Sequence, residues 1–145
     1  MTKPDVLISV AERFVAAFRS GTKTAEVRRR RLNVPPDTRI WIYTKMPTGR
    51  VELVGRVEKV VAATPTSLWK KYGAQTGITR AEFFDYLTGC KIAYVILVAD
   101  FKALDKKPTL SELRRSKRGF HPPQFAKMIE NDGALHRALS SAVAA

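Results

Sequence analysis

The sequence is poor in cysteine and histidine. Its 145 residues include one cysteine, Cys90, which cannot form an internal disulfide, and two histidines, His121 and His136. These three residues do not have the spacing of a zinc site, and the chain has no glycine-rich phosphate loop, so we expect no metal and no cofactor. A fold held together by internal disulfides is excluded.

Long hydrophobic runs are also missing. The longest apolar run, residues 92–99, is far shorter than the roughly 20 residues that a membrane-spanning helix needs. Near the start, Glu12 and Arg13 follow an apolar stretch that is too short for a signal peptide. We therefore expect no membrane association and a cytoplasmic location. A hydrophobic content of 45% suits one compact domain with its own core.

Acidic residues are scarce relative to basic ones. The chain has 13 Asp and Glu against 26 Lys and Arg, which gives a net charge of +13 and indicates a polyanionic partner. The basic residues gather in segments 13–31 and 102–118, where only Glu26, Asp105 and Glu112 are acidic. Nucleic acid is the favoured partner. A solvated charged surface, anionic lipid and a protein partner remain open as alternatives.

The hydrophobic pattern predicts strands interrupted by helices. Alternating apolar residues favour strands, with a bulge or a close backbone approach at Gly55, whereas capping residues and a period near 3.6 favour helices. The expected strands are 5–10, 24–30, 38–46, 51–62 and 91–101, and the expected helices are 11–21, 64–73, 79–89, 108–115 and 122–132. Residues 131–145 are expected to form a C-terminal helix or tail. This order predicts an α+β fold, a small mixed β-barrel of about five to six strands with helices packed over its openings.

The stretch "GTKTAEVR", residues 21–28, fits the pattern G-x-K-x-x-E-x-R. It is preceded by "ISV" and a helix, and it is followed in order by "IWIYTKMP", "LVGRVEKVV", "LWKKYG", "GITRAEFFDYLTG", "PTLSELRR" and "HPPQF". With these surroundings the chain resembles the ASCH domain family of the PUA-like superfamily over roughly residues 6–130. We accordingly expect the domain to span residues 1–130.

The resemblance implies a PUA-like pseudo-barrel with a cleft beside the motif that binds RNA, single-stranded or structured. Lys23, Glu26, Arg28 and Tyr43 would build this cleft. The four consecutive arginines at residues 28–31 and the segment "LRRSKRG" would hold the RNA backbone. The full set of expected nucleic-acid-binding residues is Lys23, Glu26, Arg28, Arg29, Arg30, Arg31, Tyr43, Arg50, Arg114, Arg115, Lys117 and Arg118.

Glu26 is the single acid in its basic segment. In a strand, Glu26, Arg28 and Arg30 would project to one face and Val27, Arg29 and Arg31 to the other. Glu26 would then orient Arg28 and accept a hydrogen bond from an exocyclic amine of a base. The alternative is a solvent-exposed ion pair of little energetic weight.

Two enzymatic branches of the family suggest further functions. For a metal-independent ribonuclease, the residues able to supply an acid, a base and a cation are Lys23, Tyr43, Lys45 and His121, with Arg50 as a further cation. Phe125 follows Gln124 where the family commonly has a serine, which weakens a mechanism that needs that hydroxyl. For an acylcytidine amidohydrolase, Lys23 is retained, but Glu26 stands in place of the nucleophilic threonine and Thr76 near the carboxylate position, so a ribonuclease is the favoured enzyme. A regulatory module that contacts a protein is a third alternative.

Overall fold

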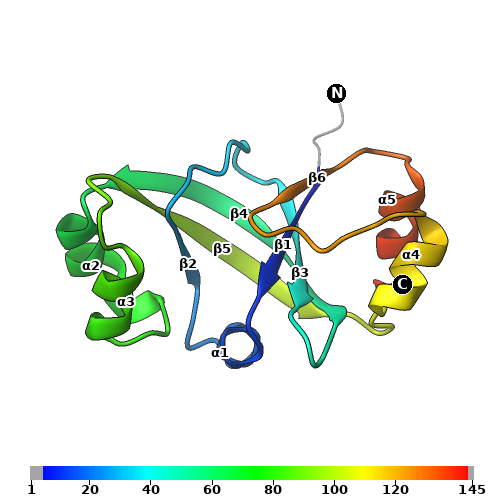
Figure 1. The fold of residues 1–145 in the computed structure, drawn as a ribbon, viewed down its shortest axis with the longest axis horizontal. Coiled ribbons are helices and arrows are strands. Elements are labelled where there is room, and N and C mark those ends of the chain that lie inside the picture. Colours follow the sequence, from blue (N-terminus) through cyan, green and yellow to red (C-terminus); the bar gives the residue numbers. More distant parts are fainter. Residues whose placement is uncertain (1–4, 144–145) are drawn as a thin grey trace.

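Six strands form one curled, mixed sheet in the computed structural model, which describes residues 5–143 (Figure 1). The sheet order is β2-β5-β4-β3-β1-β6, and neighbours are antiparallel except for the parallel pair β1 and β3. The strands are β1 (Asp5–Val10), β2 (Ala25–Arg28), β3 (Arg39–Thr44), β4 (Arg50–Ala63), β5 (Ala93–Ala103) and β6 (Lys127–Ile129). The curl brings the edge strand β2 back toward β1. We call the opening between β2 on one side and β1 with residues 121–126 on the other the seam.

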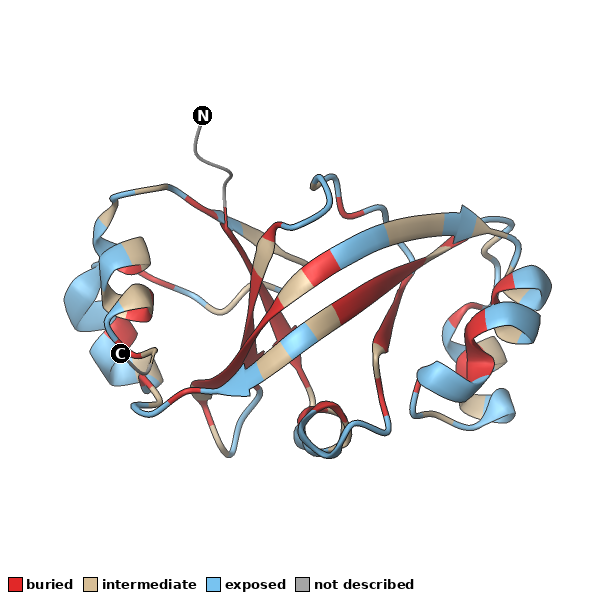
Figure 2. Cartoon of the chain, turned by 180° about the vertical axis from the view of Figure 1, so that it is seen from behind, coloured by how far each residue is buried: buried red, intermediate tan, exposed pale blue. Residues whose placement is uncertain are grey.

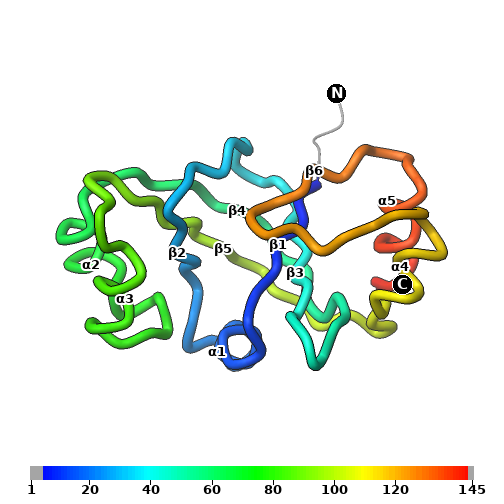
Figure 3. Tube along the Cα trace, viewed as in Figure 1, coloured from blue at the N-terminus to red at the C-terminus, as the bar shows by residue number. Residues whose placement is uncertain are grey.

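Helices lie at both ends of the sheet and at one end of the seam. Figures 1 and 3 show α2 and α3 at one end of the molecule, α4 and α5 at the other, and α1 between β2 and β1. None of the helices within residues 5–143 is long and apolar enough to cross a lipid bilayer. The helices are α1 (Glu12–Ser20), α2 (Pro65–Tyr72), α3 (Arg80–Tyr86), α4 (Leu110–Ser116) and α5 (Ala134–Ser140), with a 3-10 turn at Gly73–Gln75.

Local sequence signals explain where these helices begin and end. Thr79 with Glu82 and Thr109 with Glu112 form the two capping boxes that the sequence predicts, and each satisfies backbone donors in the first turn. Gly21 ends α1 in the left-handed conformation, with φ of 84°. The last turn of α1 therefore leads directly into the residues of the motif.

The core has three parts, and each packs against one side of the sheet. Val15 and Phe18 of α1 pack into the hollow of the curled sheet, while α4 and α5 cover the opposite face of β1 and β3. Helices α2 and α3 pack on Ala25 and Val27 of β2 and on β5. Figure 2 shows the buried residues running along the strands. Because Ala25 and Val27 face α2 and α3, alternation turns the intervening Glu26 and the following Arg28 toward the seam.

Gly55 confirms the close approach expected in β4. The pairing of β4 with β5 shifts register between Val54 and Arg56. A Cβ at Gly55 would lie 2.9 Å from Val98 Cγ1 and 3.0 Å from the Phe101 ring. The bulge therefore needs a residue without a side chain at this position.

The helix predicted over 122–132 is wrong. The structure has an irregular segment through Pro122 and Pro123 and then strand β6, whose Ile129 pairs with Asp5 of β1. The two prolines remove backbone donors, and the free edge of β1 offers partners that the local sequence does not reveal. Strand β2 is also shorter than the expected 24–30, since it ends at Arg28.

The C-terminal segment forms the helix α5 rather than a tail over its described part. Leu135 and Leu139 are buried in the part of the core that lies between α4, α5 and the strands β1 and β3. Residues 144 and 145 of the expected helix lie outside the described residues. The helix therefore contributes to the core of the domain.

Shortening a buried side chain of α5 should strongly lower the stability of the domain. Leu139→Ala removes a fully buried side chain, so we expect the free energy of unfolding to fall by about 2–5 kcal/mol in urea titrations. Met128→Ala is the control, because this apolar side chain is 47% exposed and its loss should cost less than about 1 kcal/mol. Equal effects of the two substitutions would show that α5 is not docked in solution.

Candidate functional site

A cavity of about 570 Å³ lies along the seam. Side chains from α1, β1, β2, α3 and the loops at Lys45 and Gln124 line it. This volume lies within the range of pockets that hold small ligands. Segments that are distant in the sequence therefore meet at one concave site.

An ion triad of Lys23, Glu26 and Arg28 occupies the floor of this cavity. Glu26 Oε1 lies 3.3 Å from Lys23 Nζ, and Glu26 Oε2 lies 2.8 Å from Arg28 Nη2. The three side chains are 2%, 11% and 9% exposed for Lys23, Glu26 and Arg28, respectively. The triad is therefore buried, which differs from the exposed ion pair considered as the alternative for Glu26.

Lys23 is held by backbone carbonyls as well as by Glu26. Its Nζ donates to the carbonyl oxygens of Thr76 at 2.6 Å and Ala25 at 2.9 Å. Gly77, which follows the 3-10 turn and has a φ of 70°, allows this segment to pack closely against the Lys23 side chain. A Cβ at this position would lie 3.0 Å from Lys23 Cβ. Burial lowers the pKa of Lys23, Arg28 and Arg13 lower it further, and Glu26 partly offsets these effects.

Arg28 joins the two sides of the seam. Its Nη2 donates to the carbonyl oxygen of Ser9 in β1, and its Nη1 donates to that of Phe125 in the segment before β6, each at 3.3 Å. The Nε of Arg28 is buried and has no hydrogen-bond partner among residues 5–143. One guanidinium thus connects β2, β1 and the loop that lies beside β1.

Charges inside the cavity nearly balance. Arg13 pairs with Glu82 at the rim, in addition to the triad on the floor. Lys45 is exposed, and its side chain has no ion pair or hydrogen bond within residues 5–143. The basic lining residues are Arg13, Lys23, Arg28 and Lys45, and the acidic ones are Glu26, Glu82 and Asp85. Most of the excess positive charge of the protein therefore lies outside this cavity.

The remaining arginines of the motif segment take different positions. Arg29 donates to the carbonyl oxygens of Tyr86 at 2.6 Å and Thr88 at 3.0 Å, so it holds the end of α3. Arg30 stacks over the Phe125 ring at 4.9 Å, and Arg31 stacks over the Tyr94 ring at 5.0 Å. Arg30 and Arg31 are exposed and can still meet a ligand outside the cavity.

Tyr43 lines a second cavity that adjoins the first. This cavity measures about 320 Å³ and shares Ser9, Lys45 and Gln124 with the cavity at the seam. Tyr43 is 2% exposed, and its hydroxyl has no hydrogen-bond partner among the described residues. Burial raises the pKa of Tyr43, and Arg114 partly offsets this.

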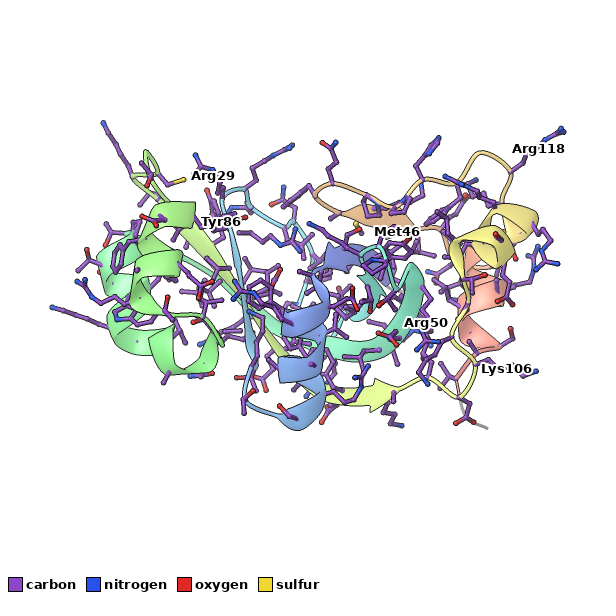
Figure 4. The ribbon with its side chains drawn as sticks, turned by 60° about the horizontal axis from the view of Figure 1, so that its bottom comes forward. Arg29, Met46, Arg50, Tyr86, Lys106 and Arg118 are labelled. Atoms are coloured by element: carbon purple, nitrogen blue, oxygen red, sulfur yellow. The ribbon has the colours of Figure 1, made fainter. Side chains whose placement is uncertain are left out.

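Other residues expected at the site line neither of the two cavities. Arg50 pairs with the buried Glu52, and Arg114 donates to the Phe120 carbonyl oxygen. His121 is exposed and lines neither cavity. Arg115, Lys117 and Arg118 are exposed on α4 and the turn after it, at the end of the molecule remote from Arg29 and Tyr86 (Figure 4). Residues 5–143 contain no group of three or more side chains suited to hold a metal ion.

Sequence reasoning missed the contribution of α3. Tyr86 is 44% exposed at the rim of the cavity, beside Arg29 in Figure 4, and Asp85 also lines the cavity. In the sequence these residues belong to an ordinary helix, and the only signal is a large aromatic side chain at the end of that helix. Folding alone brings α3 next to β2.

The buried triad should make stability depend on pH. A lowered pKa means that the unfolded chain binds more protons than the folded one up to the ordinary lysine pKa of about 10.4, so stability rises with pH in that window. Glu26→Gln removes the offsetting charge, so the rise should begin at a lower pH. At pH 7 we expect a loss of about 1–3 kcal/mol.

Urea unfolding at pH values from 7 to 10 measures this effect. The double variant Lys23→Met with Glu26→Gln is the control, and it should lose the additional pH dependence. Identical pH profiles for the wild type and Glu26→Gln would show that Lys23 and Glu26 are not coupled.

Comparisons with known proteins place this geometry among its relatives. No family model matches the chain. The chain is 30% identical over 130 residues, 90% of its own length and 87% of the relative's, to a Zymomonas mobilis protein named "ASCH domain-containing ribonuclease".

Solved structures agree in fold over nearly the whole chain. A crystal structure of ASCH from Zymomonas mobilis has a TM-score of 0.87 at 28% identity and covers 94% of each chain. A tyrosine-to-phenylalanine variant of that protein has a TM-score of 0.88 at the same identity and covers 97% of this chain and 99% of its own. These matches confirm the expected α+β, PUA-like architecture, and the chain belongs to the ASCH domain family.

Proposed function

We propose that the cavity at the seam binds single-stranded RNA, with one nucleobase inserted against Glu26. The observation that carries this proposal is a buried carboxylate held between two cations on the floor of a cavity of nucleotide size. The name of the Zymomonas relative supports an RNA-related role. An inserted base must be unpaired, which favours single strands and loops over duplexes.

Glu26 would select the base by hydrogen bonding. An ionised carboxylate offers about four acceptor sites, and Lys23 and Arg28 face only one on each oxygen. The remaining sites can accept from the exocyclic amine of cytosine, adenine or guanine, whereas uracil has no such amine. We therefore expect uridine to bind more weakly than the other nucleosides.

Aromatic and basic groups around the cavity would complete the binding site. The exposed ring of Tyr86 at the rim can stack on the inserted base. Arg30, Arg31 and Lys45 are exposed near the seam and can contact phosphates. The site would thus read the base inside the cavity and hold the backbone outside it.

Binding should weaken as salt rises. For four to six phosphate contacts, the slope of log K against log salt should be roughly −3 to −4. Replacing both Arg30 and Arg31 with Ala should make the slope shallower by about 1.4, without changing base preference. The control replaces Lys59 and Lys102, which are exposed on β4 and β5 and line neither cavity.

Glu26→Gln should have the opposite effect to the arginine replacements in the same binding assay. It should abolish the preference for amine-bearing bases and leave the salt slope unchanged. Fluorescence anisotropy with labelled homopolymers measures both quantities. A flat salt dependence, or an unchanged base preference in Glu26→Gln, would contradict the proposal.

Cleavage of RNA is the second candidate function. It is favoured by the name of the relative and by Tyr43, which lines the smaller cavity with Lys45 and whose buried hydroxyl has no partner among the described residues. A phenol with the ordinary tyrosine pKa of about 10 is already protonated near neutral pH, and burial raises the pKa of Tyr43 further, so Tyr43 suits donation to the leaving 5′-oxygen rather than proton removal from the 2′-hydroxyl. Lys45 would stabilise the negative charge on the phosphorane oxygens, and the proton of the 2′-hydroxyl would pass to solvent water.

The other two candidate catalysts have less suitable surroundings. The Lys23 ammonium already donates to two carbonyl oxygens and pairs with Glu26. His121 lines neither cavity. Cleavage would therefore depend on Tyr43 and Lys45.

A ribonuclease of this kind should cleave labelled single-stranded RNA in EDTA. Tyr43→Phe should lower kcat by about 10²-fold, within the range for general acid catalysis, and His121→Ala should leave it unchanged. Product formation on denaturing gels gives the rate. Salt-dependent binding without products would leave RNA binding as the function and exclude cleavage.

A further inference from the structure

We infer that the protein holds two consecutive nucleotides, the first against Glu26 at the seam and the second against Tyr43 in the adjoining cavity, with Lys45 on the phosphate between them. This inference rests on the RNA binding proposed above. It adds a second subsite and a minimal ligand, a dinucleoside monophosphate.

The first support is the way in which the two cavities meet. The cavities of about 570 and 320 Å³ share Ser9, Lys45 and Gln124 in their lining. The Ser9 hydroxyl is engaged, since it donates to the Pro123 carbonyl oxygen at 2.7 Å. Lys45 and Gln124 are exposed, and their side chains make no hydrogen bond or ion pair within residues 5–143. The junction therefore presents an uncommitted cation and an uncommitted amide.

The second support is the chemistry of the smaller cavity. The Tyr43 hydroxyl is a buried polar group without a partner among the described residues, and such groups cost free energy until they are paired. The surrounding side chains of Met46, Leu110, Pro122 and Pro123 are apolar. These apolar side chains beside one unpartnered hydroxyl suit a nucleobase or ribose that brings a single polar atom to Tyr43.

The third support is the distribution of charge across the two cavities. Acidic side chains line the cavity at the seam, whereas Lys45 is the only charged residue among the described ones that lines the smaller cavity. A dinucleoside monophosphate carries one negative charge at its centre, which matches the position of Lys45 at the junction. The first position should therefore require an exocyclic amine, and the second should accept any base.

The test compares cytidine with two dinucleoside monophosphates, cytidylyl-uridine and uridylyl-cytidine. Both carry 2′-O-methyl groups so that the 2′-oxygen cannot attack the phosphate. Isothermal titration at low salt should show at least one of them binding about tenfold or more tightly than cytidine. The tighter isomer identifies the strand direction across the two cavities.

Substitutions then test whether the tighter binding of the dinucleotide, relative to cytidine, comes from the second cavity. Tyr43→Phe should weaken dinucleotide binding about three- to tenfold and leave cytidine binding unchanged, as expected for one hydrogen bond. The variant should fold normally, because the hydroxyl has no partner to lose. Lys45→Ala should lower the affinity for the dinucleotide and remove the salt dependence of its binding. Tyr72→Phe on α2, away from both cavities, is the matched control.

The outcomes separate this inference from the proposed function. The second subsite is overturned, while RNA binding stands, if longer RNA and cytidine bind but neither dinucleotide binds more tightly than cytidine. The same conclusion follows if Tyr43→Phe lowers the affinity for cytidine as much as the affinity for the dinucleotide. If RNA of every length fails to bind, both proposals fall.

Discussion

The hydrogen bonds that Arg28 makes across the seam are the constraint on which the rest of the site depends. In the curled sheet, β2 pairs with β5 and not with β1, so the backbone does not close the seam. Arg28 instead connects β2 to the carbonyl oxygens of Ser9 and Phe125. A buried guanidinium needs a counter-charge, and Glu26 supplies it. The fold is therefore joined by charged groups at the place where a ligand can enter.

Glu26 also determines the electrostatic character of the cavity. Glu26 offsets one of the two positive charges of Lys23 and Arg28, so the floor carries far less charge than the +13 of the chain as a whole. Removing one member would leave an unpaired buried charge, which is strongly destabilising. Hydrophobic packing elsewhere in the domain must offset the free-energy cost of burying these charged groups. Such an arrangement is typical of a site that is retained for recognition rather than for stability.

The four consecutive arginines show how one basic run is divided among several tasks. Arg28 joins the seam, Arg29 holds the carbonyl end of α3, and Arg30 and Arg31 stack on aromatic rings at the surface. By holding α3, Arg29 also positions Tyr86 at the cavity rim. Net charge alone therefore overstates the number of arginines that are free to meet phosphate.

Local features of the fold could be predicted from the sequence. Alternation in residues 25–28, the capping boxes at Thr79 and Thr109 and the close approach at Gly55 depend on neighbouring residues, and the structure confirms them. The tertiary structure alone decided that residues 127–129 form a strand on the edge of β1, that Thr76 accepts from Lys23, and that Tyr86 borders the cavity. The partners in these contacts lie tens of residues apart or more. A local pattern cannot specify which distant carbonyl oxygen or strand edge will satisfy a donor, because only the packed chain brings the two together.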